Sequence, residues 1–162
     1  MKLYLIRHTT PHDVAPSDDA RTLTAQGKEE ARIVGTALGK MGVRPVRILT
    51  SPLVRARQTA EIIAQALVAE CGIEPVEELK NGFSTVSLLR LLKRCGPDDE
   101  VLLVGHMPGL ADHIGQLIGA GSNAGFGLGK GSVACIETLE PKAGSGQLRW
   151  LMHQNQLDQL IS

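Results

Sequence analysis

Apolar residues alternate between two spacings along the chain, and this alternation predicts strands that are followed by helices. Short, β-prone apolar runs cover residues 2–7, 46–50 and 101–104. Between the first two runs, apolar residues recur at helical spacing over residues 24–41. Continued along the chain, this order favours right-handed βαβ units around a mainly parallel sheet.

Start and stop signals delimit the first two predicted helices. Thr24 is placed to cap the first helix, and Gly42 to end it. Ser51 is placed to cap the second helix, with Pro52 at its first position and Gly72 just past its end. The predicted buried stripes are Ala31, Val34, Gly35 and Leu38 in the first helix, and Leu53, Ala56, Ala60, Ile63 and Leu67 in the second.

The second half of the chain continues the alternation and then changes character. Ser84 is placed to cap a third helix, and a fourth helix follows His106. A glycine-rich loop is predicted over residues 119–131, followed by a hairpin of two strands at residues 133–139 and 148–152. The predicted fold is a three-layer α/β/α sandwich with a mainly parallel central sheet and an edge hairpin.

Length and composition narrow the classes of function. With 162 residues the chain has the usual size of one domain, so we expect residues 1–162 to form a single domain. Lysine plus arginine and aspartate plus glutamate both number 17, and aromatic residues are scarce, so we expect neither nucleic-acid nor membrane partners. The first apolar run ends at Arg7, too early for a signal peptide, and we expect a cytoplasmic protein.

Cysteines and most histidines lack metal-ligand spacing. The three cysteines are far apart and fit neither a zinc site nor a disulfide framework, so we expect buried apolar residues. His12, His113 and His153 are expected to be structural or solvent-facing. The segment GFGLGKG at residues 125–131 lacks the serine or threonine of a nucleotide-binding loop and precedes a strand. We therefore expect no metal and no other cofactor.

Candidate chemistry gathers where three predicted strands end. Arg7 and His8 follow the first strand, Arg55 lies early in the helix after the second, and His106 follows an all-apolar strand. Ligands of open parallel sheets bind at such carboxyl ends. Any one of these residues alone is more often structural or solvated surface. Together, two arginines match the oxygens of a phosphoryl group, and His8 is placed to act as nucleophile.

Three segments resemble motifs of the histidine phosphatase superfamily. They are LIRH at residues 5–8, SPLVRARQT at residues 51–59 and VGHMP at residues 104–108. The resemblance implies a phosphoglycerate mutase-like α/β fold in which a histidine is transiently phosphorylated without a metal. By motif match, the catalytic residues that also bind phosphate would be Arg7, His8, Arg55 and His106.

A narrower resemblance, to the SixA-type phosphohistidine phosphatases, rests on the short chain and on RTLTAQG at residues 21–27. Arg21 in this segment could reach the phosphate or pair with a carboxylate of Asp18 or Asp19. Thr9 stands where the family usually has glycine, and it could narrow the pocket or donate a hydroxyl hydrogen bond. We count Arg21 and Thr9 as further candidate phosphate ligands.

The acid that protonates an ester's leaving group has no clear counterpart, although Glu77 and Glu78 lie in roughly the right region. A leaving imidazole needs less help from an acid than an alkoxide does. We therefore expect a phosphatase that acts through a phosphohistidine intermediate on phosphohistidine in a protein. The alternatives are a small-molecule phosphomonoesterase, a mutase, and a non-catalytic domain that binds phosphoproteins.

Overall fold

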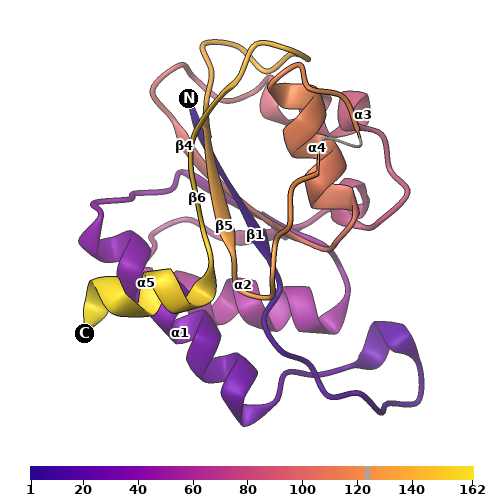
Figure 1. Ribbon diagram of the computed structural model, residues 1–162, viewed down its shortest axis with the longest axis vertical. Helices are drawn as coiled ribbons and strands as arrows, with labels where there is room; N and C mark the ends of the chain where they lie inside the picture. The colour runs from indigo at the N-terminus through magenta and orange to yellow at the C-terminus, as the bar shows by residue number, and fades with distance from the viewer. Residues whose placement is uncertain (123–124) are drawn as a thin grey trace.

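A six-stranded sheet lies between two layers of helices in the computed structural model, which describes residues 1–122 and 125–162 (Figure 1). The strands are β1 (Lys2–Arg7), β2 (Arg47–Thr50), β3 (Ile73–Pro75), β4 (Glu100–Gly105), β5 (Val133–Glu137) and β6 (Gln147–Met152). The helices are α1 (Ala25–Lys40), α2 (Val54–Leu67), α3 (Thr85–Leu92), α4 (Gly109–Leu117) and α5 (Gln154–Ile161), with short 3-10 helices at Asp18–Ala20 and Glu77–Leu79.

The sheet has the order β3-β2-β4-β1-β5-β6. Strands β3, β2, β4 and β1 pair in parallel, whereas β5 is antiparallel to β1 and β6 is antiparallel to β5. This arrangement confirms the predicted three-layer α/β/α fold with a mainly parallel sheet and an edge hairpin. Because β2, β4 and β1 are neighbours and parallel, their carboxyl ends meet on one rim of the sheet.

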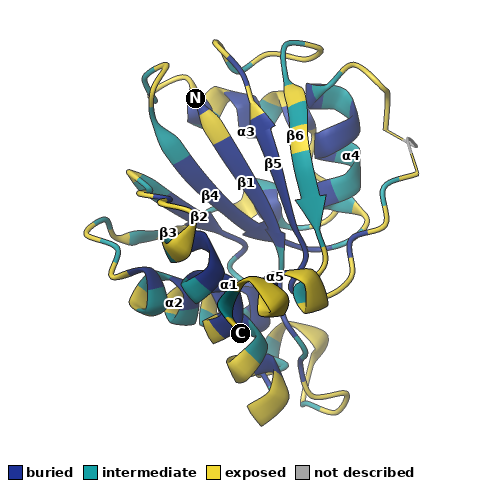
Figure 2. Cartoon of the chain, turned by 60° about the vertical axis from the view of Figure 1, so that its left-hand side comes forward, coloured by how far each residue is buried: buried dark blue, intermediate teal, exposed yellow. Residues whose placement is uncertain are grey.

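The sheet is buried on both faces, and residues 101–104 of its central strand β4 are all apolar. Leu102 and Val104 of β4 face a core shared with α1, α2 and α5, while Val101 and Leu103 face a core shared with α3 and α4. The dark central strands of Figure 2 show this burial. The continuous apolar run therefore behaves as expected of a strand covered by helices on both sides.

Two helix starts lie where their capping residues predict them. The Thr24 hydroxyl accepts the N–H of Gly27 at the start of α1, and the Ser84 hydroxyl accepts the N–H of Ser87 at the start of α3. Each cap satisfies one of the N–H groups that a helix leaves unpaired in its first turn. Gly42, predicted to end the first helix, has a φ of 82° just beyond it.

The predicted limits of the second helix are wrong at both ends. It begins at Val54, with Leu53 in the capping position, and not directly after Ser51. It ends at Leu67, and Val68, not Gly72, takes the left-handed conformation with a φ of 53°. The Ser51 hydroxyl, predicted to cap this helix, contacts a histidine that follows another strand, as described below.

Besides the two 3-10 helices, the short strand β3 and the C-terminal helix α5 were not predicted. The predicted loop at residues 119–131 contains neither helix nor strand in its described parts, residues 119–122 and 125–131, while residues 123 and 124 lie outside the described residues. No helix within the described ranges is both long enough and apolar enough to cross a membrane.

Candidate active site

The rim formed by β1, β4 and β2 brings the four principal candidate residues together. Arg7 is the last residue of β1, His8 follows it, Arg55 is in the first turn of α2, and His106 follows β4. The rings of His8 and His106 lie 5.1 Å apart between centroids. His8, Arg55 and His106 are exposed by only 6%, 7% and 3%, so this polar cluster is largely closed off from solvent.

A backbone carbonyl sets the orientation and tautomer of His8. The Nδ1 atom of His8 lies 2.8 Å from the backbone oxygen of Thr9. A carbonyl oxygen only accepts hydrogen bonds, so Nδ1 carries the proton. In the neutral ring the other nitrogen, Nε2, is then unprotonated and has a free lone pair. This is the form in which an imidazole acts as a nucleophile.

Ser51 holds the ring of His106. Its hydroxyl oxygen lies 2.7 Å from Nε2 of His106 and also accepts the N–H of Leu53 at 3.3 Å. The second ring nitrogen, Nδ1, is buried and has no hydrogen-bond partner. Ser51, predicted to cap a helix, thus joins the ends of β2 and β4 and leaves one nitrogen of His106 free to bind a ligand.

The two arginines are each fixed by protein oxygens at their terminal nitrogens. Arg7 donates from Nη1 to the backbone oxygen of Leu128 at 2.8 Å. Arg55 donates from Nη1 to the backbone oxygen of Asp18 at 2.8 Å, and its Nη2 lies 3.1 Å from the Asp18 carboxylate. In both arginines Nε is buried without a partner.

The unpartnered nitrogens point to a ligand that accepts hydrogen bonds. In the described part of the chain, three buried side-chain nitrogens lack a partner: Nε of Arg7, Nε of Arg55 and Nδ1 of His106. Native proteins contain few such groups, because each one left unpaired costs about 1–3 kcal/mol. Their concentration in one cluster, beside two guanidinium charges, is typical of a site for a small oxyanion.

Burial keeps both histidines of the cluster neutral. It lowers the pKa of His8 to about 3, and the nearby charges of Arg55 and Arg7 act in the same direction. Burial also lowers the pKa of His106 to about 4, with Arg55 again favouring the neutral ring and Asp18 opposing it. At neutral pH the His8 ring is therefore neutral, with a lone pair on Nε2.

The same pKa values predict how the stability of the fold depends on pH. The unfolded chain binds protons on these residues near pH 6.5, whereas folded His8 and His106 stay neutral down to about pH 3 and about pH 4. Below pH 6.5 the unfolded state thus holds more protons than the folded state. The free energy of unfolding should therefore decrease as the pH is lowered, by at most roughly 1.4 kcal/mol per pH unit for each histidine. Urea unfolding between pH 7.5 and 5 should show a shallower dependence in His8→Asn, and an unchanged one would contradict this linkage.

The remaining predicted phosphate ligands have partners within the protein. Thr9 donates its N–H to the hydroxyl of Thr59 at 3.1 Å, and the two hydroxyls lie 3.2 Å apart. The Thr59 proton goes to the backbone oxygen of Arg55 at 2.7 Å, so the Thr9 hydroxyl is the donor to Thr59. Thr9 thereby ties the segment after β1 to α2, and its contact with phosphate stays a prediction.

Arg21 pairs with a carboxylate, the second of the two contacts that the sequence analysis expected for it. Its Nε donates to the backbone oxygen of His12 at 2.8 Å, and its Nη1 lies 3.1 Å from the Asp18 carboxylate. A direct contact between Arg21 and phosphate stays a prediction. Asp18, which the sequence offered only as a surface partner, therefore contacts both Arg21 and Arg55. The spacing of three residues between Asp18 and Arg21 could have indicated the first contact, but nothing in the sequence signals the second.

The hydrogen bonds and ion pairs of the acidic segment after β3 connect neither Glu77 nor Glu78 to the four principal candidate residues. Glu77 pairs with Lys80 at 3.2 Å, and Glu78 is partly exposed. A role for either glutamate stays a prediction.

His113 is buried and lies 2.7 Å from the hydroxyl of Thr85, as expected of a structural histidine. Within the described ranges, no group of three or more histidine, cysteine or acidic side chains is arranged to hold a metal ion.

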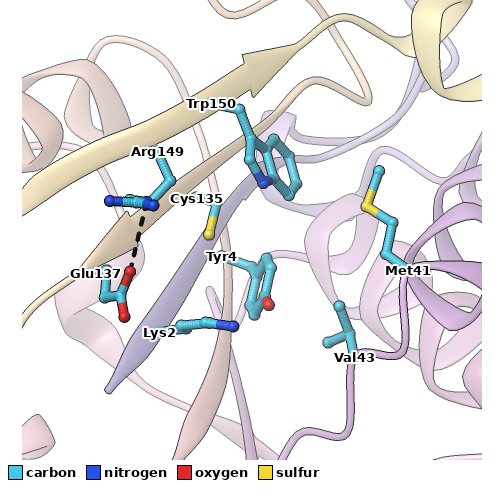
Figure 3. A pocket seen from close by; sticks show the side chains of 8 residues that line it. All are labelled: Lys2, Tyr4, Met41, Val43, Cys135, Glu137, Arg149 and Trp150. Atoms are coloured by element: carbon cyan, nitrogen blue, oxygen red, sulfur yellow. Dashed lines mark ion pairs between the residues drawn. The ribbon is translucent and has the colours of Figure 1, made fainter.

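A separate hollow of about 560 Å³ lies toward the opposite end of β1, where Lys2 and Tyr4 line it together with Trp150 of β6 (Figure 3). Tyr4 donates to Glu100 at 2.8 Å, and its ring centroid lies 6.0 Å from that of Trp150. The hollow contains none of the candidate phosphate ligands. The oxyanion cluster is therefore a distinct site at the carboxyl rim.

Comparison with known proteins agrees with this geometry. The model of the histidine phosphatase superfamily (branch 1) matches residues 3–82. An uncharacterized protein of Picosynechococcus is 40% identical over 118 residues, 69% of this chain and 70% of that protein. Phosphohistidine phosphatase SixA of Escherichia coli is 27% identical over 155 residues, 94% of this chain and 93% of SixA.

Among solved structures, the protein histidine phosphatase SixA complexed with tungstate superposes with a TM-score of 0.88 and 25% identity, over 97% of this chain and 99% of that one. The similarity thus includes the whole sheet and both helical layers, beyond the segment that the family model matches. Sequence motifs, fold and relatives agree, and the chain belongs to the histidine phosphatase superfamily, within which it is similar to SixA over nearly its whole length.

Proposed function

We propose that this phosphatase removes the phosphoryl group from phosphohistidine in a protein, through a covalent intermediate on His8. The observation that carries the proposal is the neutral Nε2 of His8 beside buried, unpartnered nitrogens of Arg7, Arg55 and His106. A phosphoryl group has three oxygens that accept hydrogen bonds and a phosphorus atom open to attack. This cluster of side chains offers donors for the oxygens and one lone pair for the phosphorus.

In the first step, Nε2 of His8 forms a bond to phosphorus while the bond from phosphorus to the substrate's imidazole nitrogen breaks. The bonding electrons stay on the leaving imidazole, which takes a proton from solvent. Arg7 and Arg55 neutralise the charge on the phosphoryl oxygens, and His106 donates from Nδ1 in the tautomer in which Ser51 donates to Nε2. A water molecule then attacks phosphorus, the bond to His8 breaks with its electrons returning to Nε2, and phosphate leaves with both protons of the water.

The relatives support the substrate class. SixA of Escherichia coli is named a phosphohistidine phosphatase, and the matching structure of SixA holds tungstate. Tungstate is a tetrahedral oxyanion with the shape and charge of phosphate, so a pocket of the same fold and motifs is suited to a phosphoryl group.

A substrate panel tests the proposal. Catalytic efficiency on a phosphorylated histidine domain should exceed that on phosphoserine peptides, phosphoglycerates and sugar phosphates measured in one buffer containing EDTA. EDTA should leave turnover unchanged, because the guanidinium groups of Arg7 and Arg55 supply the positive charge. Glu77→Gln and Glu78→Gln serve as matched variants, which should lower ester turnover only if one of these acids protonates a leaving oxygen. A clear preference for a small ester would defeat the substrate assignment.

A further inference from the structure

Asp18 contacts the guanidinium of Arg55 at two points, although neither the motifs nor the proposed chemistry assigns it a role. It lies in the short 3-10 helix Asp18–Ala20, between β1 and α1. Its backbone oxygen accepts from Nη1 of Arg55 and its carboxylate from Nη2. A guanidinium has five N–H groups, so Asp18 takes two of them and leaves the buried Nε–H unpaired.

The carboxylate of Asp18 is itself held in place. Its second oxygen accepts from Arg21, whose Nε donates to the backbone oxygen of His12. The base of this loop is closed by the bridge between Pro11 and Leu23 and by the N–H of Leu23, which donates to the Gln58 side chain of α2 at 2.7 Å. The loop that carries Asp18 is therefore attached at its base to the same helix that carries Arg55.

Such an anchor matters because arginine is long and has many rotamers. A guanidinium without such contacts would spend part of its time in orientations in which Nε cannot reach a ligand. Ligand binding would then be weakened by the conformational entropy lost when the side chain is ordered. The Asp18 side chain is 63% exposed, so its ion pair with Arg55 contributes little to the stability of the fold. Its effect should appear in ligand binding.

We infer that Asp18 is a positioning residue that orients Arg55 so that the buried Nε faces the phosphoryl group. The inference deepens the proposed function and rests on the same site. The opposite role is competition, in which the carboxylate occupies Arg55 until phosphate displaces it. The two roles differ in sign: removing the carboxylate weakens oxyanion binding if Asp18 positions Arg55, and tightens it if Asp18 competes.

Tungstate binding to Asp18→Ala, measured by calorimetry, tests the sign. We expect a loss of roughly 10- to 100-fold, as when partners that orient metal ligands are removed, because the backbone contact with Arg55 alone remains. The Asp18→Asn variant keeps an oxygen acceptor and should recover part of the loss. Asp19→Ala removes the same charge from the adjacent exposed residue and should bind as wild type. Tighter binding by Asp18→Ala, or an equal loss in Asp19→Ala, would overturn the inference.

A double-mutant cycle separates positioning from a general structural effect. If Asp18 acts through Arg55, then Asp18→Ala should cause little further loss of tungstate affinity or of kcat/KM in an Arg55→Ala background. Additive losses would contradict the inference. Because tungstate binding requires no turnover, a chain that binds tungstate in this pattern but hydrolyses no phosphohistidine would defeat the proposed function and leave the role of Asp18 standing.

Discussion

Replacing His8 with alanine should abolish turnover of every substrate and remove the covalent intermediate. The ring is neutral, buried and fixed through Nδ1 by the carbonyl of Thr9, and only its Nε2 offers a lone pair to phosphorus. We expect turnover to fall by at least about a thousandfold, more than the loss of a single transition-state donor usually costs. Phosphate label transferred to the wild-type protein should be acid-labile, as a P–N bond is, and absent from His8→Ala.

The exposed His12, four residues further along the chain, gives the matched control. His12→Ala should keep both turnover and labelling. Tungstate binding by His8→Ala would show that the oxyanion site persists, since Arg7, Arg55 and His106 still supply its donors. If His8→Ala retained turnover, or if label remained on it in acid-labile form, His8 could not be the nucleophile.

Capping residues in the sequence predicted the starts of α1 and α3 correctly but not the start of α2. Thr24 and Ser84 cap helices as expected because each hydroxyl meets an N–H three residues further on. Ser51 has the same local signature, but His106, 55 residues away, takes its hydroxyl at 2.7 Å, and the helix begins at Val54. The hydroxyl there serves a partner far away in the sequence as well as the N–H of Leu53, and its local signature does not give the residue at which the helix begins.

The two missed elements carry weak patterns. Helix α5 has only eight residues, so the helical spacing of Leu157, Leu160 and Ile161 extends over too short a segment to predict a helix. Strand β3 consists of Ile73, Glu74 and Pro75, too few residues for an alternation to be seen. Both elements exist because of what they pack against, α5 against α1 and β3 against β2, and a single sequence does not contain that information.

For the candidate site, the sequence predicted which residues come together but not which groups orient them. Motifs and strand ends predicted that Arg7, His8, Arg55 and His106 belong together, and the order of β2, β4 and β1, which the sequence does not reveal, brings them to one rim. What orients them was not predictable. Their partners include backbone oxygens of Thr9, Leu128 and Asp18, and a carbonyl is present at every residue, so it leaves no signature in the sequence.

The second large loss of activity should come from replacing Arg7 or Arg55. Replacing Arg7 or Arg55 by alanine should lower kcat/KM by about a hundredfold to a thousandfold, or roughly 2.7–4 kcal/mol, the cost of one lost donor to a transition-state charge. Each residue has a buried Nε without a partner and a terminal nitrogen held by a protein oxygen, so each donor is already oriented when the phosphoryl group arrives. Arg57→Ala, which changes an exposed arginine of the same helix, should leave kcat/KM unchanged.

Lysine should restore only part of the activity at either position. It supplies the same charge, but as a compact ammonium without the planar fork that binds two phosphoryl oxygens. At position 55 lysine would also lose the two contacts from Asp18 that hold the guanidinium in place. If charge alone mattered, Arg55→Lys would match the wild type in kcat/KM. If the fork and its orientation matter, as the unpartnered Nε indicates, Arg55→Lys should lie nearer to Arg55→Ala. An Arg55→Ala enzyme of unchanged efficiency would rule out the arginine as a phosphoryl ligand altogether.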